Sequence, residues 1–597
     1  MTDNRSDQDH DRTVDVLVIG SGAGGLTAAL AADARGLSTL VVEKAARFGG
    51  SSALSGGGIW APGAPPQVRA GVRLEREDVL GYLREITEGT VDEGRLKAYL
   101  EHVPKMMAFL EEASEHLEFV WKPGYPDYYP EVPGGSAEGS VINIPPIDLR
   151  RLGEDADRLL PPHAVAPPGL WIGPNELVDF YRLRQTWKGK LLFLRLLWRM
   201  VRARLLGERV VTMGQALMTR LMLAFRERGL ELWLDSPMTS LITDAAGRVT
   251  GAEISRGGTV RRVRALGGVV VASGGFDHGA ELRRAHQPHA DPALSLGATS
   301  NTGDGIVAAQ EAGADVALMD GAWWYPAVAW GDGRVQFSLN ERMMPAQFIV
   351  NGDGDRFINE AAPYQDFGAT MISGEAAGVR HVPVWLITNE WCWRRYVIFG
   401  HLPLPRIPFA PVPTGRRLPA SWEASGSVAT GRTLDEIAER IGVPAGRLRR
   451  TADRYDRAAR TGRDPDFHRG DSVYDRYYSD RTLPHPNLAP LGEGPYYAFA
   501  LVLSDLGTNG GVRTDERARA LRADGSAIGG LYATGNASAT VMGRSYAGAG
   551  ATLGPAMTFG YVAANDIADA RAATDTGPGA GAHGASGLED PERRRTA

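Results

Sequence analysis

The chain has 597 residues, of which 43% are hydrophobic and 23% charged, a composition typical of a globular protein and not of a disordered or fibrous one. Lys and Arg number 65 and Asp and Glu 71, which gives a net charge of −6, so we expect no nucleic-acid partner. The single cysteine, Cys392, excludes a disulfide framework and a cysteine-rich metal or iron–sulfur site, so we expect no metal and a cytoplasmic location. Residues 1–12 lack the apolar run of a signal peptide, and no segment predicts a transmembrane helix.

The first elements along the chain form a βαβ unit around a glycine motif. Its parts are an apolar strand over 15–20, the glycines Gly20, Gly22 and Gly25, an Ala-rich helix over 26–35 and a second strand over 37–43. The first glycine allows a tight turn, the second lets the backbone approach a pyrophosphate, and the third lets the helix pack on the strand. Glu43 ends the second strand, where an acidic residue can bind a ribose hydroxyl. The pattern predicts a Rossmann-like dinucleotide site.

Two further runs of small residues indicate FAD rather than NAD. The first follows directly after Glu43 and extends to Gly58, as if a long cofactor were threaded through it. The second lies far along the chain, at 530–535, and is followed by a helix that begins at Thr552. A distant second patch suits a cofactor whose far end needs its own cradle. The N-terminus of the helix could there stabilise negative charge on a reduced isoalloxazine.

The middle of the chain alternates helices, loops and strands. The predicted elements are helical spacing over 80–116, Pro- and Gly-rich loops over 120–180, a basic and apolar segment over 181–206, strands over 230–265, a buried strand over 268–276, mixed strands and helices over 317–500 and a last helix over 551–570.

Three aromatic clusters stand out in glycine- and proline-rich surroundings. They read PDYYP at 126–130, PYQDF at 363–367 and GRSYAGAG at 543–550. Tyr546 directly precedes the glycine turn that we expect to contact the flavin. Taken alone, each tyrosine is more often a packing residue with a satisfied hydroxyl.

Together these motifs resemble those of the FAD-dependent 3-ketosteroid Δ1-dehydrogenases, in the fumarate reductase and succinate dehydrogenase flavoprotein superfamily. The resemblance is carried by EKAARFGGSSALSGGGIW, VVVASGGF, SNTGDG, GLYATGN and the three tyrosine clusters in the same chain order. It implies a tightly held FAD. Relatives that attach FAD covalently use a histidine near the position of Ser51 and Ser52, and none stands there, so we expect non-covalent binding. The expected FAD-binding residues are Gly20, Gly22, Ala23, Gly25, Glu43, Lys44, Gly50, Ser51, Ser52, Gly57, Met238, Ala272, Gly274, Asp304, Gly535, Asn536, Thr552 and Leu553.

The resemblance also implies catalytic roles for four residues. Tyr364 is the general base that removes a proton from C2 of a 3-ketosteroid, and Tyr128 hydrogen-bonds Tyr364 and helps it to ionise. Tyr546 and the backbone N–H of Gly550 bind the C3 carbonyl oxygen, and a hydride passes from C1 to flavin N5. The chemistry is reasonable, because a proton next to a ketone becomes acidic only when donors meet the charge that develops on the oxygen.

The expected fold class is α/β, with a discontinuous Rossmann-like FAD-binding domain and an inserted α+β catalytic domain. The expected boundaries are a disordered N-terminus over 1–12, FAD-binding parts over 13–321 and 508–570, a catalytic and substrate domain over 322–507, and a disordered tail over 571–597.

Residues 151–209 look like an insertion relative to compact members of the family. Within 181–209 nine Lys and Arg residues face one acidic residue, Glu208. One hypothesis is a membrane-surface helix through which steroids enter from lipid, at the inner face of the membrane. We favour the alternative, a helix that packs on its own protein with a solvated basic face.

Several functions remain open beside the 1,2-dehydrogenation of 3-ketosteroids in steroid degradation. They are a 3-ketosteroid 4-ene dehydrogenase acting on 5α-saturated steroids, a fumarate reductase-like reductase of enones or dicarboxylates, and a non-catalytic lipid-binding protein. The triple tyrosine pattern argues against the first, and the aromatic stretch 323–330 argues against a dicarboxylate site. The phosphate glycines and Tyr364 argue against the third. The expected partners are a 3-ketosteroid substrate and a quinone or soluble electron acceptor.

Overall fold

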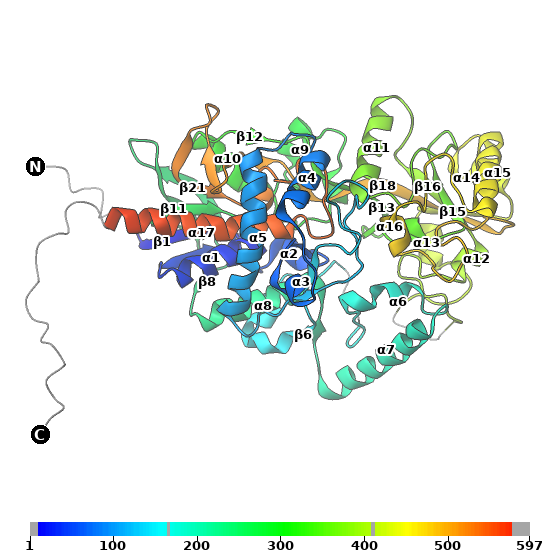
Figure 1. The fold of residues 1–597 in the computed structure, drawn as a ribbon, viewed down its shortest axis with the longest axis horizontal. Coiled ribbons are helices and arrows are strands. Elements are labelled where there is room, and N and C mark those ends of the chain that lie inside the picture. Colours follow the sequence, from blue (N-terminus) through cyan, green and yellow to red (C-terminus); the bar gives the residue numbers. More distant parts are fainter. Residues whose placement is uncertain (1–9, 164–166, 407–411, 576–597) are drawn as a thin grey trace, which may run out of the picture.

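A mostly parallel sheet forms around the N-terminal glycine motif. The computed structural model describes residues 10–163, 167–406 and 412–575, and this sheet lies in the lobe on the left of Figure 1. The central strands are nearly fully buried, as expected for parallel strands covered on both faces. Its path is β20 (Arg519–Leu521), β21 (Ala527–Ala533), β11 (Thr259–Val271), β1 (Arg12–Ile19), β2 (Thr39–Val42) and β8 (Glu231–Trp233), with the antiparallel strands β9 (Met238–Thr243) and β10 (Val249–Arg256) paired beyond β11.

The register aligns the carboxyl ends of the parallel strands. Ile19 lies beside Val42 on one side and Val271 on the other. The loops that follow β1, β2 and β11 therefore meet at one edge, where ligands bind in open α/β sheets.

Helices cover this sheet through close contacts at small residues. The helix α1 (Ala23–Ala34) packs on α17 (Leu553–Asp575) and α8 (Met213–Glu227), and α17 also packs on α5 (Glu93–Ala113). A Cβ on Gly560 would lie 2.4 Å from the carbonyl oxygen of Gly24. Only glycine allows the two helices to approach this closely.

A second, antiparallel sheet forms the lobe on the right of Figure 1. Its long central strand β18 (Tyr496–Thr508) pairs with strands on both sides, and helices pack on its faces. The other elements of this lobe are β13 (Ala322–Ala329), β14 (Val335–Phe337), β15 (Gln347–Val350), β16 (Val384–Asn389), β17 (Val428–Gly431), α11 (Tyr364–Ala376), α14 (Leu434–Ile441) and α15 (Ala445–Thr461).

The two sheets give the chain an α/β fold with an α+β part inserted in it. Further elements outside the two sheets and outside residues 144–211 are α2 (Gly50–Leu54), β3 (Ile59–Trp60), α3 (Pro65–Arg69), α4 (Arg76–Ile86), β4 (Val120–Trp121), β5 (Val141–Asn143), α9 (Ala280–His286), η3 (Pro292–Leu294), α10 (Asp304–Glu311), β12 (Val316–Ala317), η4 (Glu341–Met343), α12 (Glu390–Trp393), α13 (Ala420–Ala424), α16 (Val473–Tyr477), β19 (Gly511–Val512) and η5 (Gly535–Ala537).

Several predicted limits differ from the structure. The first strand begins at Arg12, inside the segment expected to be disordered, because Arg12 pairs with Val263 of β11 and forms an ion pair with Glu231. The last helix continues to Asp575, five residues past its expected end, and an ion pair joins Arg571 to Asp15. The rest of both predicted disordered ends, 1–9 and 576–597, lies outside the described residues.

The expected loop region 120–180 contains short ordered elements. The strands β3, β4 and β5 form a small three-stranded sheet, and β6 (Ile147–Asp148) pairs with β7 (Val210–Val211). The elements that follow β6 are η1 (Leu149–Arg158), η2 (Pro174–Glu176), α6 (Leu177–Tyr181) and α7 (Trp187–Leu206).

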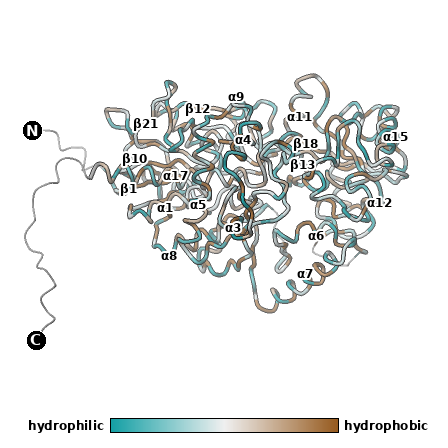
Figure 2. Tube along the Cα trace, in the orientation of Figure 1, coloured by the Kyte–Doolittle hydropathy of each residue, from teal (hydrophilic) through white to brown (hydrophobic). Residues whose placement is uncertain are grey.

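The helix α7 lies along the lower border of the molecule in Figure 1. Its trace in Figure 2 carries hydrophobic and hydrophilic residues along its whole length. It buries only Gly189, Leu192, Leu196 and Ala203, and leaves several large apolar side chains exposed. The favoured interpretation, an apolar face packed on the protein with a basic face in solvent, is therefore wrong for most of the apolar residues. None of the helices in the described ranges is long and apolar enough to span a membrane.

Candidate active site

A cavity of about 590 Å³ lies where the strand ends of the parallel sheet face the second sheet. Its wall combines the glycine loop after β1, the start of α17, the strand β14 and the start of α11. Pockets of this size commonly hold cofactors and small apolar ligands. The cavity therefore joins the predicted cofactor motifs to the predicted tyrosine motifs.

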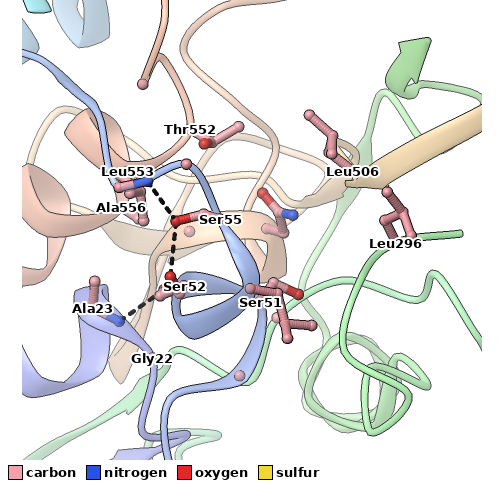
Figure 3. Close-up of a pocket in the computed structure, with 18 of the residues that line it drawn as sticks. Gly22, Ala23, Ser51, Ser52, Ser55, Leu296, Leu506, Thr552, Leu553 and Ala556 are labelled. Carbon is pink, nitrogen blue, oxygen red and sulfur yellow. Dashed lines mark hydrogen bonds between the residues drawn. The ribbon is translucent and has the colours of Figure 1, made fainter. Parts of the chain in front are cut away.

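The first wall of the cavity is made of backbone and small side chains. Gly20 adopts φ +109°, and a Cβ there would lie 2.4 Å from the carbonyl oxygen of Ala272. Gly22 is different, because its Cβ would meet only the hydroxyl of Ser52, at 3.4 Å. The same hydroxyl accepts a hydrogen bond of 3.0 Å from the backbone N–H of Ala23 (Figure 3). Space is thus kept free at the start of α1, where backbone N–H groups suit a phosphate.

Charged groups stand on either side of this glycine loop. The carboxylate of Glu43 is buried and accepts hydrogen bonds from the backbone N–H of Ser21, at 3.1 Å, and from its hydroxyl, at 2.7 Å. The ammonium group of Lys44 lies 2.5 Å from the carboxylate of Asp304 at the start of α10. These partners hold Glu43 and Lys44 at the cavity wall, where the sequence places the ribose.

Ser51 and Ser52, which follow the glycine loop, hydrogen-bond to different segments of the chain. The Ser51 hydroxyl accepts hydrogen bonds of 2.9 Å from the backbone N–H of Ala298 and from the side-chain amide of Asn301. Asn301 also donates to the buried carboxylate of Asp277, at 2.6 Å. Asn301 lines the cavity but was missed as a site residue, although it lies within the SNTGDG motif.

The residues present fit FAD. The glycine loop leaves a cradle that a larger side chain at Gly22 would enter. The hydroxyl of Ser273, also on the cavity wall, is buried and has no hydrogen-bond partner among the described residues, so it is available to a ligand. On the opposite wall Gly550 adopts φ +94°, and a Cβ there would lie 2.3 Å from the carbonyl oxygen of Gly58.

Every predicted FAD-binding residue except one lines the cavity. Gly25 does not, because a Cβ there would lie 2.1 Å from the carbonyl oxygen of Gly20 and 3.3 Å from Val18. Its role is the close packing of the helix on the strand, and its inclusion among the ligand-contacting residues is not supported. The residues that do line the cavity are Gly20, Gly22, Ala23, Glu43, Lys44, Gly50, Ser51, Ser52, Gly57, Met238, Ala272, Gly274, Asp304, Gly535, Asn536, Thr552 and Leu553.

The three predicted tyrosines form one cluster on the cavity wall. The ring centroid of Tyr364 lies 5.5 Å from that of Tyr128 and 5.2 Å from that of Tyr546, and the Tyr128 and Tyr546 rings stack at 5.3 Å. All three side chains are nearly fully buried. They come from a loop, from the first residue of α11 and from the glycine turn before α17, so the fold brings together residues that are far apart in sequence.

Hydrogen bonds link the hydroxyl groups of this cluster. Burial raises the pKa of the Tyr364 phenol well above its ordinary value, and its interaction with Tyr546 raises it further, while the hydrogen bond with Tyr128 lowers it. Burial also raises the pKa of Tyr546, while hydrogen bonds with Tyr364, Thr552 and the backbone N–H of Gly550 lower it. The hydroxyl of Tyr546 and the N–H of Gly550 therefore lie within hydrogen-bonding reach of each other.

A positive charge lies behind the cluster. Arg342 is fully buried and donates to the carbonyl oxygens of Ser338, at 2.9 Å, and Glu360, at 2.6 Å. Burial lowers the pKa of Arg342 to about 10, while the charges of Tyr474, Glu341 and Tyr128 raise it. Such a charge favours an ionised phenol nearby. No motif marks Arg342 in the sequence, and it was missed for that reason.

The cavity wall also contains residues that the sequence did not single out. Next to Tyr128 in the sequence, the hydroxyl of Tyr129 donates a hydrogen bond of 2.7 Å to the carboxylate of Asp366. Burial raises the pKa of the Glu341 carboxyl to about 7. The further lining residues include Lys122, Tyr125, Asn143, Pro174, Leu177, Tyr181, Phe337, Glu341 and Tyr478.

Comparison with known proteins identifies the family. Residues 15–553 match the family model described as FAD binding domain. A 3-oxosteroid 1-dehydrogenase of Mycolicibacterium smegmatis is 42% identical over 94% of this chain and 98% of its own length, and a 4-oxocyclohexanecarboxylate 2-dehydrogenase of Sinomonas cyclohexanicum is 34% identical over 95% of each. The crystal structure of 3-ketosteroid delta1-dehydrogenase from Sterolibacterium denitrificans in complex with 1,4-androstadiene-3,17-dione matches with a TM-score of 0.85 and 36% identity, over 94% of this chain and 100% of that one.

These matches agree with the cradle and the tyrosine cluster on the wall of the same cavity. The chain belongs to the 3-oxosteroid 1-dehydrogenase family of FAD-binding oxidoreductases.

Proposed function

We propose that the protein removes two hydrogens from C1 and C2 of a 3-ketosteroid. The observation that carries this proposal is the tyrosine cluster on the wall of the cavity that also contains the cofactor cradle. The aromatic lining suits an apolar fused-ring substrate, whose burial is favourable by about 25 cal/mol per Å². The position of the cavity between the two sheets also supports a division into an FAD-binding part (13–321 and 508–570) and a catalytic part (322–507).

In this proposal each group of the cluster has a distinct task. Tyr546 and the N–H of Gly550 donate hydrogen bonds to the C3 carbonyl oxygen and so acidify the C2 proton. Tyr364 accepts that proton as its phenolate, which Tyr128 and the buried charge of Arg342 stabilise. FAD, when bound, supplies the hydride acceptor.

An anaerobic mixing experiment tests the reaction. Purified holoenzyme is mixed with 4-androstene-3,17-dione. The visible absorbance of the flavin is followed, and the molecular mass of the product is measured by mass spectrometry. Bleaching with a product lighter by two hydrogens supports the proposal. Bleaching only with a 5α-saturated steroid would favour the 4-ene dehydrogenase, and bleaching only with 4-oxocyclohexanecarboxylate would favour the substrate named for the Sinomonas relative. A reduced protein that is reoxidised by an enone or dicarboxylate alone would favour the reductase.

We propose that a quinone or a soluble carrier reoxidises the flavin. The single cysteine of the sequence leaves no ligand set for an iron–sulfur relay, which supports direct transfer to such an acceptor.

We also propose that α7 rests on an anionic membrane surface. Six of its apolar residues are spaced by alternating steps of four and three and so share one face, and all are exposed, Trp187 by 78% and Trp198 by 65%. The buried residues of α7 lie on the opposite face. Basic side chains flank the apolar face, among them Lys190 and Arg195. Such an arrangement is typical of helices that lie in the lipid interface. The six residues are Trp187, Leu191, Leu194, Trp198, Val201 and Leu205.

Liposome flotation tests this contact. Holoenzyme should float with vesicles that contain an anionic phospholipid and float less with neutral vesicles, and Leu194→Glu with Trp198→Glu should reduce binding by roughly tenfold or more. Val260→Glu, which alters an exposed apolar residue on the hairpin between β10 and β11, is the matched control and should bind as the parent does. No binding to anionic vesicles by the parent protein would contradict the contact.

A further inference from the structure

A buried lysine stands on the cavity wall with no acidic partner. Lys122 is 6% exposed and follows directly after β4. Its ammonium group donates one hydrogen bond, of 2.7 Å, to the carbonyl oxygen of Pro174 in η2. It also lies 4.9 Å from the ring centroid of Tyr125 and 5.6 Å from that of Tyr477. No ion pair of Lys122 occurs within the described ranges, and burial alone lowers its pKa, to about 8.

Such a position is costly unless an anion completes it. An ammonium group has three donors, and only one of those of Lys122 has an acceptor among the described residues. Removing an unpaired charge from water is unfavourable, and the aromatic faces offset only part of this cost. At neutral pH the group is still mostly protonated. The cavity wall therefore carries a positive charge that suits an anionic ligand.

A second unsatisfied donor lies on the same strand pair. The register of β4 and β5 places Val120 opposite Asn143, and the backbone N–H of Lys122 donates to Val141, so Lys122 and Asn143 lie on one face of the small sheet. Asn143 is 7% exposed and lines the cavity, and its amide nitrogen has no hydrogen-bond partner in the part of the chain that the structure describes. A carboxylate has two oxygens and can accept from both side chains.

The lysine does not contact Tyr364 or Tyr546 itself, although Tyr125 beside it hydrogen-bonds Tyr128 of the cluster. Its aromatic contacts are Tyr125 and Tyr477, whose rings stack at 4.4 Å, and not Tyr364 or Tyr546. Its acceptor Pro174 belongs to η2, which is joined to α7 by the ion pair of Glu176 with Arg199, at 2.8 Å. We infer that Lys122, with Asn143, binds a carboxylate that the substrate carries at the end remote from its ring ketone. This inference rests on the proposed function, which places the ketone at Tyr546 and Gly550.

A binding experiment tests this inference without turnover. The probes are a 1,4-dien-3-one steroid whose C17 side chain ends in a carboxylate and the methyl ester of the same compound. They already contain the double bond that the reaction would introduce. Their dissociation constants for the oxidised holoenzyme are read from the perturbation of the flavin spectrum. The acid should bind more tightly than the ester by roughly 10- to 100-fold, the range for a hydrogen bond to a charged group.

Three variants make the result specific. Lys122→Met should abolish the preference for the acid, Lys122→Arg should retain a preference because it keeps a cation, and Asn143→Leu should weaken it by a smaller factor, about threefold. Lys105→Met, an exposed lysine on α5, is the control and should leave the ratio unchanged. Equal binding of acid and ester by the parent, or a preference that survives in Lys122→Met, would overturn the inference. Conversion of 4-androstene-3,17-dione is measured separately, so failure of the proposed reaction and failure of the carboxylate site are distinguishable.

Discussion

The cofactor end and the catalytic end of the cavity are lined by different kinds of residue. The cofactor end is backbone and small side chains, with Gly22 leaving space and Ser52 fixing the start of α1. The catalytic end is aromatic and is assembled from three separate segments that contribute Tyr128, Tyr364 and Tyr546. The cofactor end is therefore sensitive to added volume, and the catalytic end is sensitive to loss of a hydroxyl group. Three substitutions test this difference between the cofactor end and the catalytic end.

The largest effect is expected at the catalytic end, from Tyr364→Phe. The ring still packs against Tyr128 and Tyr546, but no group accepts the C2 proton, so kcat should fall by roughly 10²- to 10⁴-fold while FAD stays bound. Single-turnover flavin reduction measures this effect. Tyr474→Phe is the matched control, because Tyr474 is buried against Tyr128 at 4.8 Å and its hydroxyl has no hydrogen-bond partner in the described residues. A similar loss in both variants would mean that packing, and not the base, is responsible.

A smaller effect is expected at the cofactor end, from Gly22→Val. The protein side leaves room for the first carbon, since only Ser52 lies near, so the added volume enters the space proposed for the pyrophosphate. We expect FAD affinity to fall by about 5- to 160-fold, the equivalent of about 1–3 kcal/mol of overpacking, with little change in the unfolding of the apoprotein. Fluorescence titration of apoprotein with FAD measures the affinity.

Gly81→Ala is the control for this substitution. Gly81 lies within α4, where a Cβ would meet nothing within 4 Å, and alanine favours helix. FAD affinity should be unchanged. If Gly22→Val bound FAD as the parent does, the cradle would be wrongly placed.

The smallest effect concerns the pH dependence of the catalytic end, in Tyr128→Phe. The hydrogen bond with Tyr128 lowers the pKa of Tyr364, so its loss should raise that pKa further. A base acts when ionised, so kcat rises with pH, and a higher pKa moves the rising limb to higher pH. At a fixed pH below this limb the rate should fall about tenfold. A profile of kcat against pH that keeps its position would contradict the role given to Tyr128.

The cofactor end could be predicted closely from the sequence because its signals are local. Turns that require glycine, and a helix that follows at once, mark the loop after β1 in the sequence itself. Gly25 shows the limit of such signals, because the motif includes a glycine whose task is packing and not ligand contact.

The catalytic end could be predicted only through its resemblance to a family. Periodicity does not show that Tyr128, Tyr364 and Tyr546 meet, because the contact depends on how the two sheets face each other. No sequence motif marks Arg342 or Lys122, because a buried cation is recognised only by the residues that surround it in the folded protein. The helix α7 was predicted, but the interpretation with an exposed apolar face was not the favoured one, because amphipathic spacing does not say which face packs on the protein.

Deuterium labelling of the substrate tests whether a single cavity joins the base at C2 to the hydride acceptor at C1. Holoenzyme is mixed anaerobically with 4-androstene-3,17-dione that carries deuterium at C1 and C2, and the mass of the product and the rate of flavin bleaching are recorded. We predict that the flavin bleaches more slowly than with unlabelled steroid. We also predict that the product has lost one deuterium from C1 and one from C2. Bleaching without loss of deuterium from C1 and C2, or a flavin that stays oxidised, would contradict proton removal at C2 and hydride transfer from C1.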